Sequence, residues 1–246
     1  MSNIKLTIEY DGARYSGWQR LGKGESENTI ENKLLEVIQK MTGETVELFC
    51  GSRTEVGVHA YAQIANFKTK TDMKLYEIKN YFNRYLPMDI AVIEVEEMPE
   101  RFHASLNAKS KTYLYRIAIG DVPSVFDRKY TYYCFHTPDL ALMQKAAKQL
   151  IGMHDFKDFS TIKRSKSTVK EIYSIDIIQD EKEIKITINA NDFLHNMARM
   201  VISTLLEIGL DKRNIKDIEA ILDPKSMEIG SPSANAQGLF LKEIEY

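Results

Sequence analysis

The sequence has little cysteine and no long apolar run. It contains two cysteines, Cys50 and Cys134, in 246 residues. Two are too few for a disulfide framework or a cysteine metal cluster, and a reducing cytoplasm is the default setting for such a chain. No apolar run approaches the roughly 18 residues needed to cross a bilayer, and no basic, apolar, cleavable leader begins the sequence. We therefore expect a cytoplasmic protein without a membrane partner.

The common motifs of cofactor and metal sites are also missing. The sequence has no Walker A phosphate loop, no dinucleotide fingerprint and no Gly-x-Ser-x-Gly nucleophile elbow. None of its histidines has the i, i+4 spacing of a helical zinc site, and no cysteine lies at metal-ligand spacing. These histidines are His59, His103, His136, His154 and His195. We expect no metal and no cofactor.

The charge balance does not favour a nucleic-acid binder. The net charge is -2, whereas recognition of phosphates usually leaves a basic footprint. A local basic face remains compatible with this balance. The densest basic cluster contains Lys163, Arg164 and Lys166, in a segment rich in serine and threonine. Two interpretations stay open for it, a loop that binds nucleic-acid backbone and a solvated surface loop.

Hydrophobic periodicity predicts mixed helices and strands in the first half of the chain. Ile4 and Ile8 lie in an alternating segment that predicts a strand. Asn28 and Glu31 have the spacing of a capping box, which predicts a helix from there to Gly43. The other expected elements of this half are strands at 46–49, 62–67 and 90–95, and a helix at 75–86.

The second half repeats this order approximately. We expect strands at 111–119, 167–178, 183–190 and 239–246, and helices at 139–151, 193–208 and 217–222. The order strand, helix, strand, strand, helix, strand is typical of the split βαβ arrangement of ferredoxin-like domains. The sequence therefore predicts an α+β fold of two ferredoxin-like halves, residues 1–102 and 103–246.

One short segment collects an arginine, a carboxylate, glycines and a histidine between two predicted strands. A polar loop held by a rigid sheet is a usual place for catalytic groups. Arg53 and Glu55 are two residues apart, so both side chains point to the same side if the loop is extended. The segment consists of Cys50, Gly51, Ser52, Arg53, Thr54, Glu55, Val56, Gly57, Val58, His59 and Ala60. Considered by themselves, a structural ion pair for Glu55 and a surface position for Arg53 are the simpler interpretations.

This segment resembles the motif Gly-Arg-Thr-Asp-x-Gly-Val-His-Ala of the tRNA pseudouridine synthase A family, with Glu55 at the position of the aspartate. Further segments resemble family motifs in the same order along the chain. They cover residues 10–20, 102–104, 152–156, 193–199 and 238–241. The resemblance runs from about residue 4 to residue 246.

The resemblance implies a fold and an activity. The fold would be that of a pseudouridine synthase, with antiparallel sheets, helices packed on one face and a catalytic cleft between the two halves. The activity would be that of an isomerase, which converts uridine to pseudouridine at positions 38–40 of the tRNA anticodon stem-loop without a cofactor. The family's enzyme is a homodimer, so tRNA and a second copy of the chain are the expected partners.

The resemblance also implies roles for single residues. Glu55 would be the catalytic carboxylate, Arg199 would pair with it and orient it, and Arg53 would help to turn the target nucleotide out of its stack. Tyr113 would stack on the uracil, although a half-buried strand tyrosine is the simpler interpretation without the family. The remaining candidates for contact with tRNA are Thr54 and His59 in the loop, and Lys163, Arg164 and Lys166 for its backbone.

Glu55 is one methylene longer than the family's aspartate, which moves the carboxylate by roughly an ångström. Misplacement of about 1 Å can cost on the order of a hundredfold in rate. Ser52, which stands at a common glycine position, would strain the loop if the backbone there requires positive φ. Two hypotheses follow, a working diverged synthase and a catalytically impaired paralogue that acts as a tRNA-binding or folding protein.

Overall fold

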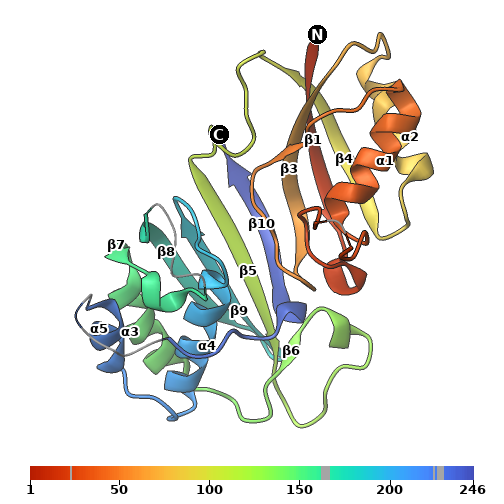
Figure 1. The fold of residues 1–246 in the computed structure, drawn as a ribbon. Helices are drawn as coiled ribbons and strands as arrows, with labels where there is room; N and C mark the ends of the chain where they lie inside the picture. The colour runs from red at the N-terminus through yellow and green to blue at the C-terminus, as the bar shows by residue number, and fades with distance from the viewer. Residues whose placement is uncertain (23, 162–166, 224, 226–229) are drawn as a thin grey trace. The chain divides into compact units, whose positions relative to one another are not determined.

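The structure is a computed structural model that describes residues 1–246 except 23, 162–166, 224 and 226–229 (Figure 1). The chain forms two compact units, the first from Met1–Lys109 with Phe240–Tyr246 and the second from Ser110–Leu239. Each unit combines a largely antiparallel sheet with helices, so the expected α+β class is confirmed. The ferredoxin-like description of the halves and their division at residue 102 stay predictions.

The sheet of the first unit is built around two long strands. β1 (Ser2–Tyr10) pairs antiparallel with β3 (His59–Thr69) on one side and with β4 (Ile90–Met98) on the other. The two-residue strand β2 (Phe49–Cys50) adds antiparallel to β3, and β10 (Leu239–Glu245) pairs parallel with the start of β3. The end of the sequence therefore completes the sheet in which the chain starts.

Two amphipathic helices cover this sheet, and both lie against the same side of it (Figure 1). They are α1 (Ile30–Thr42) and α2 (Leu75–Tyr85). Their fully buried side chains come from helically spaced apolar positions, namely Leu34, Ile38, Ile78 and Phe82. α2 packs on β4, and its Phe82 meets Phe67 of β3 edge-on with ring centroids 6.5 Å apart, so the core of the unit lies between helices and sheet.

The start of α1 differs from the expected capping box. The N-cap is Thr29, whose hydroxyl accepts a hydrogen bond from the Asn32 amide, so the assignment of Asn28 as the cap was wrong. The Asn28 side chain donates instead to the Arg14 carbonyl at 2.6 Å. Glu31 accepts from the Arg20 amide at 2.5 Å and so fixes the preceding loop rather than the helix end.

Two strand boundaries also differ. The expected strand at 46–49 is reduced to β2, because β3 offers a pairing partner only to Phe49 and Cys50. β3 begins at His59, three residues earlier than the expected 62, because His59 and Ala60 pair with β10. The candidate loop is consequently shorter than the sequence suggested.

The sheet of the second unit is antiparallel along its four main strands. In spatial order these are β5 (Ser110–Ala118), β9 (Glu183–Ala190), β8 (Val169–Gln179) and β7 (Gly152–Asp155). The short strand β6 (Tyr132–Tyr133) pairs parallel with β5. Its helices are α3 (Leu140–Leu150), α4 (Met197–Gly209) and α5 (Asp217–Leu222). α3 packs on both β8 and α4.

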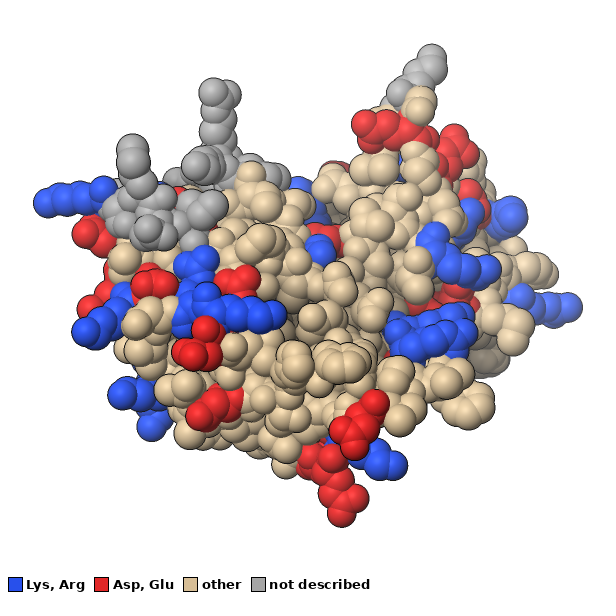
Figure 2. All heavy atoms as spheres, turned by 90° about the horizontal axis from the view of Figure 1, so that it is seen from below, with Lys and Arg blue, Asp and Glu red and all other residues tan. Residues whose placement is uncertain are grey.

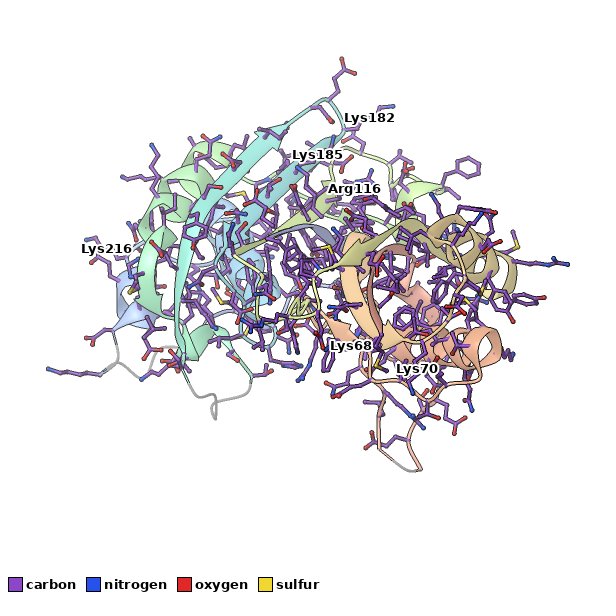
Figure 3. The ribbon with its side chains drawn as sticks, turned by 90° about the horizontal axis from the view of Figure 1, so that it is seen from above. Lys68, Lys70, Arg116, Lys182, Lys185 and Lys216 are labelled. Carbon is purple, nitrogen blue, oxygen red and sulfur yellow. The ribbon has the colours of Figure 1, made fainter. Side chains whose placement is uncertain are left out.

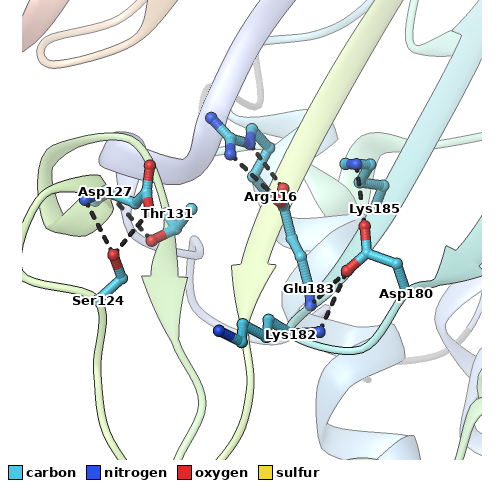
Figure 4. A network of polar contacts seen from close by, with 8 residues as sticks. All are labelled: Arg116, Ser124, Asp127, Thr131, Asp180, Lys182, Glu183 and Lys185. Atoms are coloured by element: carbon cyan, nitrogen blue, oxygen red, sulfur yellow. Dashed lines mark hydrogen bonds and ion pairs between the residues drawn. The ribbon is translucent and has the colours of Figure 1, made fainter.

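Hydrogen bonds and an ion pair fix the hairpin between β8 and β9 (Figure 4). The Asp180 side chain accepts from the backbone amides of Lys182 and Glu183 at 3.2 and 2.9 Å, which closes the turn. Arg116 on β5 makes a two-pronged pair with Glu183 at 2.6 and 3.1 Å. These contacts tie three segments of the sheet together at one end.

α4 begins later than the expected residue 193. Asn196 precedes it at φ 63, a left-handed conformation that interrupts the helix, and the helix starts at Met197. Among the described residues, no helix is both long and apolar enough to pass through a membrane.

Candidate active site

The loop that carries Arg53 and Glu55 alternates between the protein interior and its surface. Ser52 and Thr54 are buried, Arg53 is exposed and Glu55 is half-exposed. This alternation places Arg53 and Glu55 on the outer side of the loop. Ser52 and Thr54 form the inner side of the loop, where contacts with the protein interior can fix it.

Gln63 on β3 holds the loop from inside. Its amide donates to the Ser52 carbonyl at 2.5 Å and its carbonyl accepts from the Ser52 amide at 3.2 Å. Two residues after Ser52, the hydroxyl of Thr54 lies 2.7 Å from the hydroxyl of Tyr10. Burial raises the pKa of Tyr10, so this phenol stays neutral and can share a proton with Thr54.

The segment after β1 packs against the other side of the loop. The Trp18 amide donates to the Thr54 carbonyl at 3.0 Å. Gly17 has φ +90, and a Cβ there would lie 3.0 Å from the same carbonyl. A Cβ on Gly12 would lie 1.9 Å from the Val58 carbonyl oxygen, so only glycine fits. The motifs at 10–20 and 50–60 are therefore two halves of one packed arrangement.

The aromatic residues of that segment belong to the core of the first unit. Tyr10, Tyr15 and Trp18 are 3%, 4% and 1% exposed. Trp18 packs against Tyr10 with ring centroids 6.1 Å apart. Two of these residues contact the loop directly, because Tyr10 and Trp18 both form hydrogen bonds with Thr54.

A tight turn follows Glu55. The Val58 amide donates to the Glu55 carbonyl at 3.1 Å, and Gly57 supplies the positive φ of 78° that the turn requires. Ser52 does not have positive φ, since Asn196 and Asp211 are the non-glycine cases among the described residues. The serine is therefore accommodated without the strain considered for it.

His59 lies inside the first unit. It is 1% exposed, its Nδ1 accepts from the Gly12 amide at 3.1 Å and lies 3.1 Å from an Asp11 carboxylate oxygen. Its ring stacks on Phe240 of β10 at 4.7 Å. These contacts join the end of the loop to the last strand. The proposed contact of His59 with substrate stays a prediction.

In the second unit, Tyr113 lies on β5 and is 6% exposed. Its ring meets that of Phe193 edge-on, with centroids 4.9 Å apart and an interplanar angle of 84°. Tyr115 shares its face of the strand and donates to the Asn235 carbonyl at 3.0 Å. Tyr113 is therefore fixed by the ring of Phe193, and Tyr115 by the backbone carbonyl of Asn235.

Arg199 lies in the first turn of α4 and is fixed on two sides. Its Nε donates to the Ala234 carbonyl at 2.6 Å and one terminal nitrogen donates to Asn196 Oδ1 at 3.1 Å. The Asn196 amide in turn donates to the Thr161 hydroxyl at 2.9 Å. Asn196, which has a left-handed backbone, therefore links Arg199 to Thr161.

Asp192, beside Phe193, is held by two lysines. Lys111 and Lys170 contact its two carboxylate oxygens at 2.5 and 2.7 Å. Burial raises the pKa of Asp192, but attraction to Lys111 and the hydrogen bonds from both lysines outweigh burial and lower it overall. The cluster keeps one positive charge in excess near Tyr113.

The other basic candidates are not part of the described structure. Lys163, Arg164 and Lys166 lie outside the described residues. Figure 2 shows one face of the molecule, on which lysines and arginines are interspersed with acidic side chains. Within the described part of the chain, no three histidine, cysteine or acidic side chains are grouped as metal ligands could be.

Three residues that fix parts of the candidate site were not predicted from the sequence. They are Gln63, Asp192 and Asn196. A signal existed for Gln63, because a glutamine and an asparagine, Asn66, interrupt an otherwise apolar predicted strand. Asn196 stood inside a recognised segment, but nothing in the sequence indicated its backbone conformation.

An anchored polar loop that presents an arginine and a carboxylate on its outer side defines a candidate enzyme. The family model described as tRNA pseudouridine synthase matches residues 6–107 and 146–246. Several relatives match along their whole length, including the following three. tRNA pseudouridine synthase A 2 of Bacillus cereus is 42% identical over 247 residues, with 100% of both chains covered. tRNA pseudouridine synthase A of a Bacillus species is also 42% identical, and tRNA pseudouridine synthase A 1 of Clostridium tetani is 44% identical, again with 100% of both chains covered.

The chain therefore belongs to the tRNA pseudouridine synthase A family.

Proposed function

We propose that this chain is a working tRNA pseudouridine synthase, an isomerase that converts uridine to pseudouridine in the anticodon stem-loop. The observation that carries the proposal is the outward placement of Arg53 and Glu55 on a loop whose inner side is anchored. Full-length relatives named as tRNA pseudouridine synthases, 42–44% identical, support the same activity.

The reaction is an isomerisation with no net gain or loss of atoms. The bond from the ribose to N1 of the uracil breaks, the base turns, and a bond from the ribose to C5 forms. The proton on C5 leaves, and N1 carries a proton in the product. Glu55 would attack or otherwise activate the uridine, which needs a fixed carboxylate in an enclosed place more than it needs a cofactor.

Other residues would prepare the substrate and the carboxylate. Arg53 would assist the extrusion of the target nucleotide, whose unstacking costs a few kcal/mol. Tyr113 would stack on the uracil, and its edge-on contact with Phe193 supports a fixed ring orientation. Arg199 would orient Glu55, a role supported by the two hydrogen bonds that restrict its guanidinium. Thr54 would contribute by holding the loop.

The longer side chain of Glu55 is compatible with this function because the loop backbone is fixed on both sides of it. The Trp18 amide fixes Thr54 before it and the turn to Val58 fixes the Glu55 carbonyl itself. A fixed backbone leaves the glutamate one additional torsion with which to place its carboxylate. The proposal therefore requires glutamate at this position and not merely any carboxylate.

The test is formation of pseudouridine in an unmodified tRNA transcript. We expect product from the parent chain, and a loss of roughly a hundredfold or more in Glu55→Gln, which keeps the side-chain shape and removes the charge. Glu47→Gln is the matched control, because Glu47 is an exposed glutamate just before β2. It should leave turnover unchanged.

The same assay decides between the proposal and a catalytically impaired paralogue, which the glutamate at the aspartate position motivates. Tight tRNA binding without product in the parent, together with strong turnover in Glu55→Asp, would establish the impaired paralogue and refute the working enzyme. Product from the parent, reduced in Glu55→Asp, is the result expected here. Mapping the product to positions 38–40 tests the proposed site.

We also propose a homodimer as the active form. A second subunit would enlarge the basic surface offered to one tRNA beyond what a chain of net charge -2 provides. Light scattering of the purified protein should give twice the mass of one chain. The mass of a single chain at working concentration would contradict this.

A further inference from the structure

The first unit carries a pocket apart from the outer side of the candidate loop. It has a volume of about 410 Å³ and lies between β2, the end of β3 and the turn after β4. None of its lining residues belongs to the set discussed for catalysis. Volumes of this order are within the range of small-molecule and nucleotide sites.

Aromatic rings form one wall of the pocket. The rings of Phe49 and His103 lie 4.3 Å apart at an interplanar angle of 37°. Both residues are half-buried, so each keeps part of its surface open. Proteins bind unpaired bases by stacking them on such rings.

The floor of the pocket is built from buried hydrogen bonds. Asn66, 1% exposed, accepts from the Ala104 amide at 2.8 Å and donates to the Phe102 carbonyl at 3.3 Å. Asn3, 2% exposed, donates to the same carbonyl at 2.9 Å. The turn after β4 is thus fixed on the sheet, and the pocket has a defined shape before any ligand enters.

The ring of His103 is oriented by backbone amides of the turn that follows it. Its Nδ1 accepts from the amides of Ser105 and Leu106 at 3.1 and 3.3 Å. A neutral imidazole that accepts at Nδ1 carries its proton on Nε2, so that nitrogen is a hydrogen-bond donor. The aromatic wall therefore includes one donor that an RNA base or ribose could use.

The rim carries two cations and one carboxylate. Lys68 lies 3.9 Å from Glu100, and their side chains are 40% and 84% exposed. An exposed ion pair of this kind contributes little to stability, so a phosphate can replace the carboxylate of Glu100. Arg101 is exposed beside it. Figure 3 shows Lys68 on β3 of the first unit, two residues before Lys70.

The pocket lies on the same strand that anchors the candidate loop. Phe49 pairs with Asn66, and Asn66 is three residues from Gln63 on β3. At about 3.3 Å per residue, the pocket floor is roughly 10 Å from the clamp on Ser52. Three residues is an odd separation, so the side chains of Asn66 and Gln63 point to opposite faces of the sheet, and an RNA that contacts both the loop and the pocket has to extend roughly 10 Å along β3.

We propose that this pocket is a second RNA subsite, which binds one unpaired nucleotide of the tRNA outside the target position. Its base stacks on Phe49 and His103, and its phosphate is bound by Lys68 and Arg101. This inference rests on the proposed function for the choice of tRNA as ligand. The subsite acts in binding and takes no part in the chemical step.

The decisive experiment compares two neighbouring lysines. Fluorescence anisotropy of a labelled, unmodified tRNA transcript gives Kd for Lys68→Ala and for Lys70→Ala at several salt concentrations. Lys70 is exposed just beyond the end of β3 and does not line the pocket, so it is the matched control. We expect Lys68→Ala to raise Kd about three- to tenfold and to reduce the slope of log K against log salt by about 1. Equal effects of the two substitutions would overturn the proposal.

A second pair of variants tests the stacking. Phe49→Leu removes the ring and should raise Kd about five- to tenfold, whereas Phe49→Tyr keeps it and should restore binding. In both, kcat at saturating tRNA should match the parent while KM follows Kd. If Phe49→Leu binds as tightly as Phe49→Tyr, the pocket does not stack a base. Should Phe49→Leu fail to fold, the exposed lysine pair still decides.

Failure of this proposal is separable from failure of the proposed function. The binding measurements need no turnover, so a catalytically impaired chain would still show the difference between Lys68 and Lys70. Conversely, a chain that forms pseudouridine with both lysine variants equal in Kd would be an enzyme without this subsite.

Discussion

Substitution of Gln63 should separate catalysis from RNA binding. The side chain is 0% exposed and makes two hydrogen bonds with the backbone of Ser52, at 2.5 and 3.2 Å. Gln63→Leu keeps much of the buried volume and removes both. Each such bond lost to a buried group costs about 1–3 kcal/mol, so the loss of two should lower the free energy of unfolding by about 2–6 kcal/mol.

The larger effect should be on turnover. Ser52 is three residues before Glu55, and release of its backbone lets the loop shift. A shift of about 1 Å in an aligned carboxylate can cost roughly a hundredfold in kcat. Binding of tRNA should change little, because Gln63 contacts the loop from the interior and the RNA approaches from outside. The expected result is therefore a loss in kcat with Kd nearly unchanged.

Three measurements on one set of variants test this reasoning. Urea unfolding gives the stability, pseudouridine formation at saturating tRNA gives kcat, and anisotropy gives Kd. Gln39→Leu is the matched control, an exposed glutamine on α1 of the same unit. Parental kcat in Gln63→Leu would refute the argument that this side chain positions the loop. Equal losses of kcat and binding would also refute it, because they would indicate general misfolding.

Three further outcomes are expected. Gly12→Ala, whose Cβ would lie 1.9 Å from a backbone oxygen, should abolish turnover and destabilise the protein by about 3 kcal/mol, which corresponds to a fall in Tm of about 6–12 °C. A Tm close to that of the parent would contradict this. Ser52→Gly should lower the free energy of unfolding, measured in urea, by about 0.4–1 kcal/mol, because Ser52 lacks positive φ and glycine adds entropy to the unfolded chain. A gain in stability would show that the serine strains the loop backbone. Asp192→Asn should lower stability at pH 7, and the difference from the parent should disappear as pH falls below about 4. The pKa of Asp192 is lowered in the folded state, so its ionised form stabilises the protein above the ordinary pKa and this stabilisation is lost on protonation. A difference in stability between variant and parent that persists in urea titrations at about pH 2 would contradict this role of Asp192.

Local patterns in the sequence predicted much of the fold. Apolar residues at helical spacing indicated α1, and Gly43 ends it in the left-handed conformation at φ 73. The two-residue spacing of Arg53 and Glu55 predicted a shared side, because it depends only on extended backbone. The strand expected at 46–49 was mostly wrong, since β-propensity forms a strand only where a partner strand is available.

The contacts that fix the candidate site could not be obtained in that way. Gln63 reaches Ser52 because the register of β2 against β3 places Cys50 opposite Ala65. Tyr10 reaches Thr54 because the register of β1 against β3 brings Tyr10 opposite Ala60. Register is a property of the whole sheet and of its pairing partners. The same holds for Asn196, whose positive φ is stabilised by a partner far along the chain, Thr161.

The return of β10 to the first unit sets the order in which the protein can be completed during synthesis. His59 and Ala60 pair with Phe240 and Leu241, and the Tyr246 hydroxyl bonds the Ala104 carbonyl across 142 residues. While the ribosome makes the whole second unit, the first unit lacks this strand and the ring that stacks on His59. Translation proceeds at about 5–20 residues per second, so the nascent chain spends many seconds in that incomplete state. The loop that carries Glu55 thus receives its full support only after the last strand has been made, and the contacts of longest sequence separation are those that complete the site.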